Sequence, residues 1–92
     1  MSLLKDIVAP RRPKASPDGG TYSRRQAVSL SAQPGSQIRY TLGTRQPAPR
    51  LRTGNVYRGR QIRITATQTL KAIAVDKAGN VSPVTKQRYV IR

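Results

Sequence analysis

The residues of this chain best suited to chemistry are its arginines. Seven lie between positions 39 and 63 with no acidic residue among them: Arg39, Arg45, Arg50, Arg52, Arg58, Arg60 and Arg63. A guanidinium group is planar, permanently charged and able to donate two parallel hydrogen bonds to a phosphate or sulfate group. The segment therefore predicts a surface that binds polyanions such as nucleic acid or acidic polysaccharide.

Two arrangements of these arginines are open. Arg39 and Arg63 each lie between two apolar residues of an alternating segment, which directs both guanidinium groups to solvent. The other five lie in loop or turn segments, so the seven form either one coherent patch or a ring of separate solvated charges. Tyr57, with Tyr22 as a second candidate, is an exposed ring that could stack on a base or a sugar.

Groups that catalyse reactions or bind metals are scarce. The chain has no histidine, cysteine or glutamate, and its three acids are Asp6, Asp18 and Asp76. Asp18 and Asp76 lie near glycines in segments typical of turns, where a structural role accounts for them. Zinc needs His or Cys, calcium needs several carboxylates, and no serine or threonine has a visible base to activate it. We expect no enzyme activity, no metal and no cofactor.

The positive charge belongs to the folding part of the chain. Its net value is +15; residues 1–20 carry four bases and two acids, and residues 21–92 carry 14 bases and one acid. Such a field attracts polyanions and membrane headgroups and opposes self-association, which favours a monomer. The alternative is a solubilising surface, or one matched to an acidic neighbouring domain.

The apolar pattern predicts short β-strands. Apolar and polar residues alternate over residues 28–32, 38–42 and 62–65, and apolar runs at 56–57, 70–75 and 84–91 complete the set. Turn residues separate these runs, and no helical periodicity longer than two turns follows residue 10. A single small domain of six or seven strands is typical of a β-sandwich.

The strand expected at residues 70–75 is apolar on both faces. Leu70, Ala72 and Ala74 lie on one face, and Ile73 and Val75 lie on the other. Either this strand is covered on both sides, or two β-branched residues are exposed to a neighbouring domain or a second copy. The Asp, Gly and Asn residues that follow predict a hairpin turn to the next strand.

Residues 1–19 are predicted to form a proline-rich basic linker or N-terminal arm, and residues 20–92 the sandwich module. Pro10, Pro13 and Pro17 lie among basic residues, in a segment suited to extended polyproline-like backbone. The apolar patch at residues 3–8 is too short for a signal peptide or a transmembrane segment.

Three segments together carry a family resemblance. They are Gly20-Thr21-Tyr22, then Ile38-Arg39-Tyr40-Thr41-Leu42 with Pro47, and then residues 70–82 with Tyr89. Over residues 17–91 the chain resembles the chitobiase/β-hexosaminidase C-terminal-type domain, a module appended to bacterial hydrolases and surface proteins. The resemblance implies an all-β, immunoglobulin- or fibronectin-III-like antiparallel sandwich. Where the family reads Asp-Gly-Ser after its Tyr-Thr strand, this chain reads Gly43-Thr44-Arg45, so the acidic turn residue is replaced by a basic one.

Three functions follow from these observations. The resemblance implies a non-catalytic accessory module, a spacer or docking domain whose partner is a neighbouring domain of a larger bacterial protein. The arginines favour a stand-alone polyanion-binding protein. The hydrolases to which domains of this family are appended suggest a carbohydrate-binding module. A larger exported protein would place the module outside the cell or in the cell envelope; a true 92-residue product would place it in the cytoplasm.

Overall fold

Eight β-strands form the regular secondary structure of residues 8–92, the part of the chain that the computed structural model describes. In chain order they are β1 (Lys14–Ser16), β2 (Gly20–Tyr22), β3 (Gln26–Ser31), β4 (Gln37–Gly43), β5 (Asn55–Tyr57), β6 (Ile62–Ile64), β7 (Gln68–Val75) and β8 (Thr85–Ile91). The six strands expected from the apolar pattern correspond to β3 to β8, and the pattern did not indicate β1 or β2. Residues 1–7, with Asp6 and most of the expected apolar patch, lie outside the described residues.

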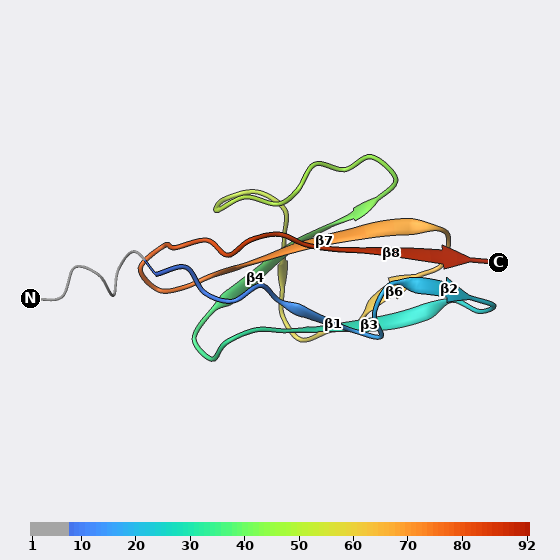
Figure 1. Cartoon of the computed structure of the whole chain (residues 1–92), viewed down its shortest axis with the longest axis horizontal. Helices are drawn as coiled ribbons and strands as arrows, with labels where there is room; N and C mark the ends of the chain where they lie inside the picture. The colour runs from blue at the N-terminus through green and yellow to red at the C-terminus, as the bar shows by residue number, and fades with distance from the viewer. Residues whose placement is uncertain (1–7) are drawn as a thin grey trace, which may run out of the picture.

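The strands form two sheets that enclose the core (Figure 1). One sheet has the order β1-β3-β6, and the other has the order β2-β8-β7-β4-β5. Neighbouring strands are antiparallel except β2 and β8, which run parallel. The prediction of an all-β sandwich is confirmed, with this one parallel pair as a departure from a purely antiparallel fold.

Residues 14–22, which span the end of the N-terminal arm and the start of the expected module, contribute a strand to each sheet. β1 pairs with β3, and β2, just after Pro17, pairs with β8 in the other sheet. Ala15 is 8% exposed and belongs to the core. The strand pairing thus begins before the expected boundary at residue 20. The sequence pattern does not indicate β1 because a strand of three residues is too short to show alternation. The prolines on either side of it also argue against a strand, but they are tolerated because β1 lies at the edge of its sheet.

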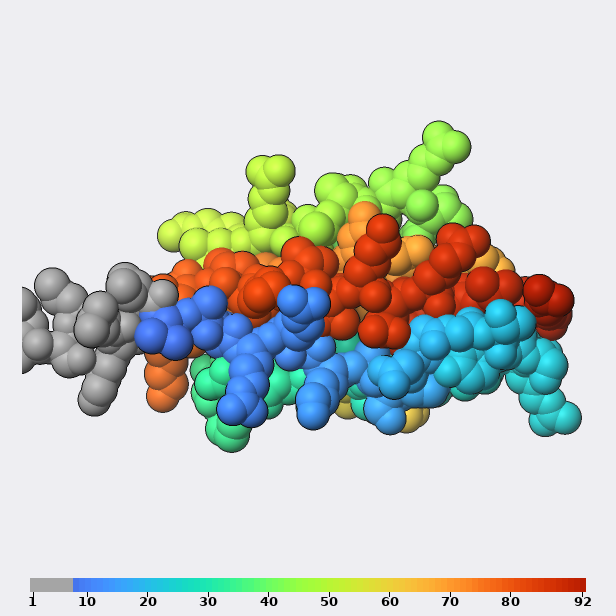
Figure 2. All heavy atoms as spheres, in the orientation of Figure 1, coloured from blue at the N-terminus to red at the C-terminus, as the bar shows by residue number. Residues whose placement is uncertain are grey.

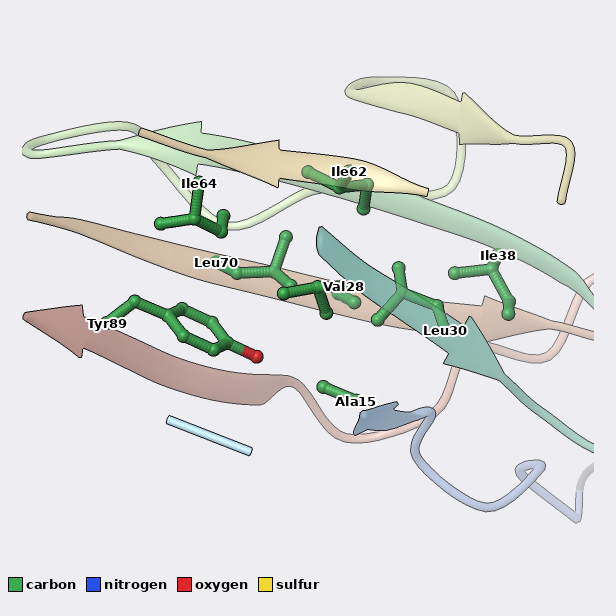
Figure 3. Close-up of a cluster of buried hydrophobic side chains, with 9 residues drawn as sticks. Ala15, Val28, Leu30, Ile38, Ile62, Ile64, Leu70 and Tyr89 are labelled. Atoms are coloured by element: carbon green, nitrogen blue, oxygen red, sulfur yellow. The ribbon is translucent and has the colours of Figure 1, made fainter. Parts of the chain in front are cut away.

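The core lies between the sheets and takes one face of each strand. Tyr89 is its largest fully buried side chain, and its ring lies among aliphatic side chains of both sheets (Figure 3). Its neighbours in the core cluster are Ala15, Val28, Leu30, Ile38, Ile62, Ile64, Leu70 and Ala72. The inward positions of β3 and β6 are thereby fixed, so the residues between them point outward.

Strand β7 is buried on both faces. Ile73 is 1% exposed and Val75 is 7% exposed, although both lie opposite the face that carries Leu70 and Ala72. Of the two alternatives that the sequence left open, the covered strand is confirmed. The chain covers this strand itself, so the burial of Ile73 requires no partner.

Much of this cover is the loop of residues 44–54, between β4 and β5. Three outward side chains of the five-stranded sheet hold it: Arg39 donates to the Gly54 carbonyl at 3.2 Å, Thr41 to Pro47 at 2.8 Å and Lys71 to Gln46 at 2.9 Å. Pro49, within the loop, is buried. The loop is therefore held to the sheet at Gln46, Pro47 and Gly54, with Pro49 buried between these points.

The turn after β7 has the chemistry that its sequence predicts. The Asp76 carboxylate accepts hydrogen bonds from the amides of Ala78 and Asn80, at 3.0 and 2.8 Å, and from the Asn80 side chain at 3.1 Å. These bonds stabilise the ionised carboxylate, so the pKa of Asp76 lies below its usual value, with the Asn80 side chain as the largest cause. Ser82 completes the turn by accepting from the Ala74 amide at 2.8 Å.

No helix of residues 8–92 has the length and apolarity that a membrane-spanning helix requires.

Candidate anion-binding surface

The segment that connects β5 to β6 crosses from one sheet to the other and carries two exposed arginines, Arg58 and Arg60. Beside it lies a hollow of about 720 Å³ on the outer side of the three-stranded sheet. Arg60 and Arg63 line this hollow, and so does Arg25, which precedes β3. Three guanidinium groups from separate places in the sequence thus meet at one concave surface.

The strand register explains why the surface is hollowed. Ala27 of β3 is paired with Arg63 of β6, and both lie between buried residues of their strands, so both point away from the core. A methyl group beside a long arginine leaves a depression between them. Gln26 and Gln61 complete the lining and add neutral hydrogen-bond donors. We call the residues that line this hollow, Arg25, Gln26, Ala27, Arg60, Gln61 and Arg63, the arginine hollow.

A second depression of about 360 Å³ adjoins the first, because Arg60 and Gln61 line both. Its other lining residues include Arg58 and Tyr57. Tyr57 is half-buried, and its ring meets that of Tyr40 edge-on with centroids 6.4 Å apart. The ring edge borders the depression, but Tyr57 does not stand free as the exposed stacking platform that the sequence suggested.

The remaining tyrosines are also packed. Tyr22 is half-buried and lies against Tyr89 with ring centroids 6.3 Å apart, and Tyr89 is fully buried. None of the four tyrosines is an exposed side chain. A binding mode that relies on stacking bases or sugars on open aromatic rings therefore has little support here.

Arg39 does not join the arginine hollow. It lies on the outer face of the five-stranded sheet, half-buried, with its Nη1 atom bound to the Gly54 carbonyl at 3.2 Å. Its Nε atom is buried without a hydrogen-bond partner. The alternation of β4 correctly placed Arg39 away from the core, but it could not show that a loop returns to cover this position.

Arg45, Arg50 and Arg52 are exposed on the loop of residues 44–54. This loop forms a ridge along one side of the molecule in the space-filling view (Figure 2). None of the three lines the arginine hollow or the depression beside it. Of the seven arginines singled out in the sequence, the structure brings Arg58, Arg60 and Arg63 together and leaves the other four elsewhere.

Arg25 is the residue of this surface that sequence analysis missed. Arg24 and Arg25 stand immediately before β3, outside residues 39–63, the segment that predicts the binding surface. The signal available was their position: because β3 pairs with β6 in antiparallel register, the start of β3 lies beside the end of β6. Without that pairing, residues 25 and 63 have no visible relationship.

Carboxylates contribute little to the electrostatics of this surface. Residues 8–92 contain two acids, Asp18 and Asp76, and the latter is engaged by its own turn. Within the same residues, no three His, Cys, Asp or Glu side chains gather to hold a metal ion. The lining of the arginine hollow is cationic and polar, a composition suited to anions, and among the described residues it includes no carboxylate or histidine that could act as a general base.

A comparison with known protein families matches residues 17–86 to the family described as the chitobiase/beta-hexosaminidase C-terminal domain. The match spans the sandwich from the end of β1 to the start of β8, and includes every residue of the arginine hollow. Searches of the curated proteins and of the solved structures found no match to this chain.

Proposed function

The chain belongs to the chitobiase/β-hexosaminidase C-terminal domain family, and we propose that it serves as a non-catalytic accessory module, a spacer or docking domain within a larger protein. The observation that carries this proposal is the extent of the family match, residues 17–86, which takes in β2 to β7 and the start of β8. The chemistry of the side chains supports it, because His, Cys and Glu are absent from the sequence.

The path of the chain suits a spacer. The first described residues enter at one end of the long axis, and β8 leads to the C-terminus at the opposite end (Figure 1). Domains joined at these two points would be held apart by the length of the sandwich. The parallel pairing of β2 with β8 places the strand that follows the arm and the last strand in one sheet, so tension between the ends would act on paired strands.

Assays for hydrolysis test the non-catalytic part of this proposal. The chain should release no product from chromogenic N-acetyl-β-glucosaminides above the rate in buffer. The proposal would be overturned by turnover that persists through purification and disappears in Asp18→Asn, because Asp18 is the described carboxylate not engaged by a turn. Circular dichroism of the variant would show whether its fold is retained.

Polyanion binding is a second candidate function, and the convergence of Arg25, Arg60 and Arg63 on one hollow favours it. A cluster of guanidinium groups without a facing carboxylate is suited to phosphate or sulfate groups along a chain. The arginines would bind the backbone of a nucleic acid or the acidic groups of a polysaccharide, with little reading of sequence.

A salt titration of binding with two matched triple variants tests this second function. Arg25→Gln, Arg60→Gln and Arg63→Gln together remove three charges from the arginine hollow; Arg45→Gln, Arg50→Gln and Arg52→Gln remove three from the loop. On duplex DNA the slope of log K against log salt should fall by about 0.9 for each phosphate group that the protein no longer neutralises, and mainly in the hollow variant. A parallel titration with a sulfated polysaccharide identifies the preferred polyanion. Equal effects in both variants would contradict a localised site.

A further inference from the structure

A second group of cations lies on the outer face of the other sheet, the five-stranded one. Lys71 of β7 is paired directly with Lys86 of β8, and Thr69 is paired with Arg88. The alternate residues of these strands, among them Leu70 and Tyr89, are buried in the core. Lys71, Lys86 and Arg88 therefore project outward from adjacent strands, two of them from directly opposed positions.

Opposed like charges are unfavourable in an antiparallel pair. Side chains that face each other across two strands have Cβ atoms about 5 Å apart, and two cations at that separation destabilise the pairing. Of the two carboxylates in residues 8–92, Asp76 is engaged by the turn after β7. The fold thus keeps three cations together at a cost in stability, and a bound anion would remove that cost.

The loop of residues 44–54 turns this group of cations into a concave site. Gly43, Thr44 and Gln46 form one wall of a hollow of about 240 Å³, and the β7–β8 pair supplies Thr69, Lys71, Lys86 and Arg88. The ridge that the loop forms above β7 and β8 is visible in Figure 2. A hollow of this size takes one small ionic group, and the cations come from three positions around it.

One of the cations is already held in place. The Lys71 ammonium donates to the Gln46 carbonyl at 2.9 Å, which leaves its other two N–H groups for a ligand. A β-carbon at Gly43 would lie 2.7 Å from Cγ of Gln46, so the glycine lets the loop approach the sheet closely enough for this hydrogen bond. Thr44 and Thr69 add hydroxyl groups that can donate to further oxygen atoms.

We propose that Lys71, Lys86 and Arg88 form a binding site for one tetrahedral oxyanion, a phosphate or sulfate group, either free or as the ester of a larger ligand. This site goes beyond the proposed function and is separate from the arginine hollow, because the two lie on the outer faces of opposite sheets. A rigid polyanion seated on one face does not reach the other, so the two sites can succeed or fail independently.

Thermal unfolding in phosphate tests the proposal. The wild-type chain, Lys86→Gln, Arg88→Gln and the control Lys77→Gln are compared in sodium chloride and in sodium phosphate of equal ionic strength. Lys77 is an exposed cation on the turn after β7, so its substitution removes the same charge without touching the hollow. Phosphate stabilises many proteins through general exclusion from their surfaces, so the difference between variants is the informative quantity.

In chloride, Lys86→Gln should unfold at a higher temperature than the wild type, because one of two opposed cations is gone. In phosphate, the wild type and Lys77→Gln should gain more stability than Lys86→Gln and Arg88→Gln. Titration with inorganic phosphate followed by NMR should show binding weakened at least about tenfold in the latter two variants, because each lacks one charge-assisted hydrogen bond to the anion.

The proposal would be overturned if phosphate raised the unfolding temperature of all four proteins equally. It would also be overturned if the NMR shifts caused by phosphate centred away from residues 69–71 and 86–88. Titrations with glucose 6-phosphate and glucose 6-sulfate then separate the two sources. Tighter binding of either ester supports a site for a group carried on a larger ligand, and equal binding supports a site for the free ion. Lys77→Gln, which lies outside both hollows, should leave all of these titrations unchanged.

Discussion

The hydroxyl group of Tyr89 donates a 2.6 Å hydrogen bond to the carbonyl oxygen of Pro17. This bond joins the last strand to the N-terminal arm, although the two residues are 72 positions apart in the sequence. Two other inward positions of β8 do the same, since Thr85 donates to the Pro13 carbonyl at 2.6 Å and Gln87 accepts from the Gly19 amide at 2.6 Å. The inward face of β8 thus receives the arm through three polar side chains at alternate positions.

Replacement of Tyr89 by phenylalanine removes the bond to Pro17 and leaves the buried ring. The variant should lose about 1–3 kcal/mol of unfolding free energy at pH 7, because the Pro17 carbonyl is left without its partner. Urea denaturation followed by circular dichroism measures this change. Tyr57→Phe, which removes a hydroxyl group from a half-buried ring on β5, is the control and should change stability less.

The same residue gives the protein a dependence on alkaline pH. Burial is the main cause that raises the pKa of Tyr89 to about 12, and the charges of Tyr22 and Asp18 add to it. The unfolded chain ionises near pH 10, so the contribution of Tyr89 is complete below pH 10 and is lost between pH 10 and 12. The difference between the pKa of Tyr89 in the folded and in the unfolded chain corresponds to about 2–3 kcal/mol of unfolding free energy. The Phe variant should therefore lose less stability than the wild type over this interval.

The arm should respond to substitution as part of the core. Ala15→Glu places a carboxylate between the sheets, and an unpaired buried charge should cost about 3 kcal/mol or more. Ser16→Glu introduces the same charge one residue later, at an exposed position, and should change stability by less than about 0.5 kcal/mol. If both variants unfold at the same denaturant concentration, the pairing of β1 with β3 does not contribute to stability.

Acid should weaken the turn after β7. The pKa of Asp76 is lowered by the Asn80 side chain and by backbone amides, so its stabilising effect is complete above pH 3.8 and is lost as the pH falls through its value in the folded protein. Asp76→Asn should unfold more easily than the wild type at pH 7, and the difference should narrow below pH 3.8. Asp18→Asn removes an equal charge from the segment between β1 and β2. The prediction is wrong if the stability difference between Asp18→Asn and the wild type narrows below pH 3.8 to the same extent as that between Asp76→Asn and the wild type.

The strands that carry the core could be predicted from the sequence because alternation is a local property. β3, β4 and β6 each place β-branched or long aliphatic residues at every second position, and each appears within a few residues of its expected bounds. The inward face of β8 is harder to predict from the sequence. Its inward face holds Thr85 and Gln87, polar residues that look exposed until the arm is seen to bind them.

The surface could be predicted only in part, because it depends on the approach of segments distant in sequence. The sequence marked Arg60 and Arg63 as basic and exposed, and both line the arginine hollow. The sequence alone does not show that Arg25 lies beside these two arginines, because this depends on the register of β3 against β6. For the same reason the opposed pair of Lys71 and Lys86, 15 positions apart, carries no signal until β7 and β8 are aligned.

The loop of residues 44–54 should depend on a glycine at its end. A β-carbon at Gly54 would lie 2.9 Å from Cβ of Pro49 and 3.1 Å from the Tyr40 carbonyl, and the backbone there has a φ of +93°. Gly59 has a nearly equal φ of +91°, but nothing lies within 4 Å of its β-carbon position. Alanine at either site meets the same backbone penalty, about 1–2 kcal/mol, and only Gly54→Ala adds a collision.

Gly54→Ala should therefore lose about 1–3 kcal/mol more than Gly59→Ala, the usual cost of overpacking. The collision should also loosen the loop, because the Gly54 carbonyl accepts the Arg39 hydrogen bond. Limited trypsin digestion would detect this, since Arg45, Arg50 and Arg52 are exposed cleavage sites on the loop. Faster cleavage at these sites in Gly54→Ala than in Gly59→Ala indicates that the loop is held by close packing on the sheet. Equal cleavage would show that the three hydrogen bonds from Arg39, Thr41 and Lys71 hold the loop without it.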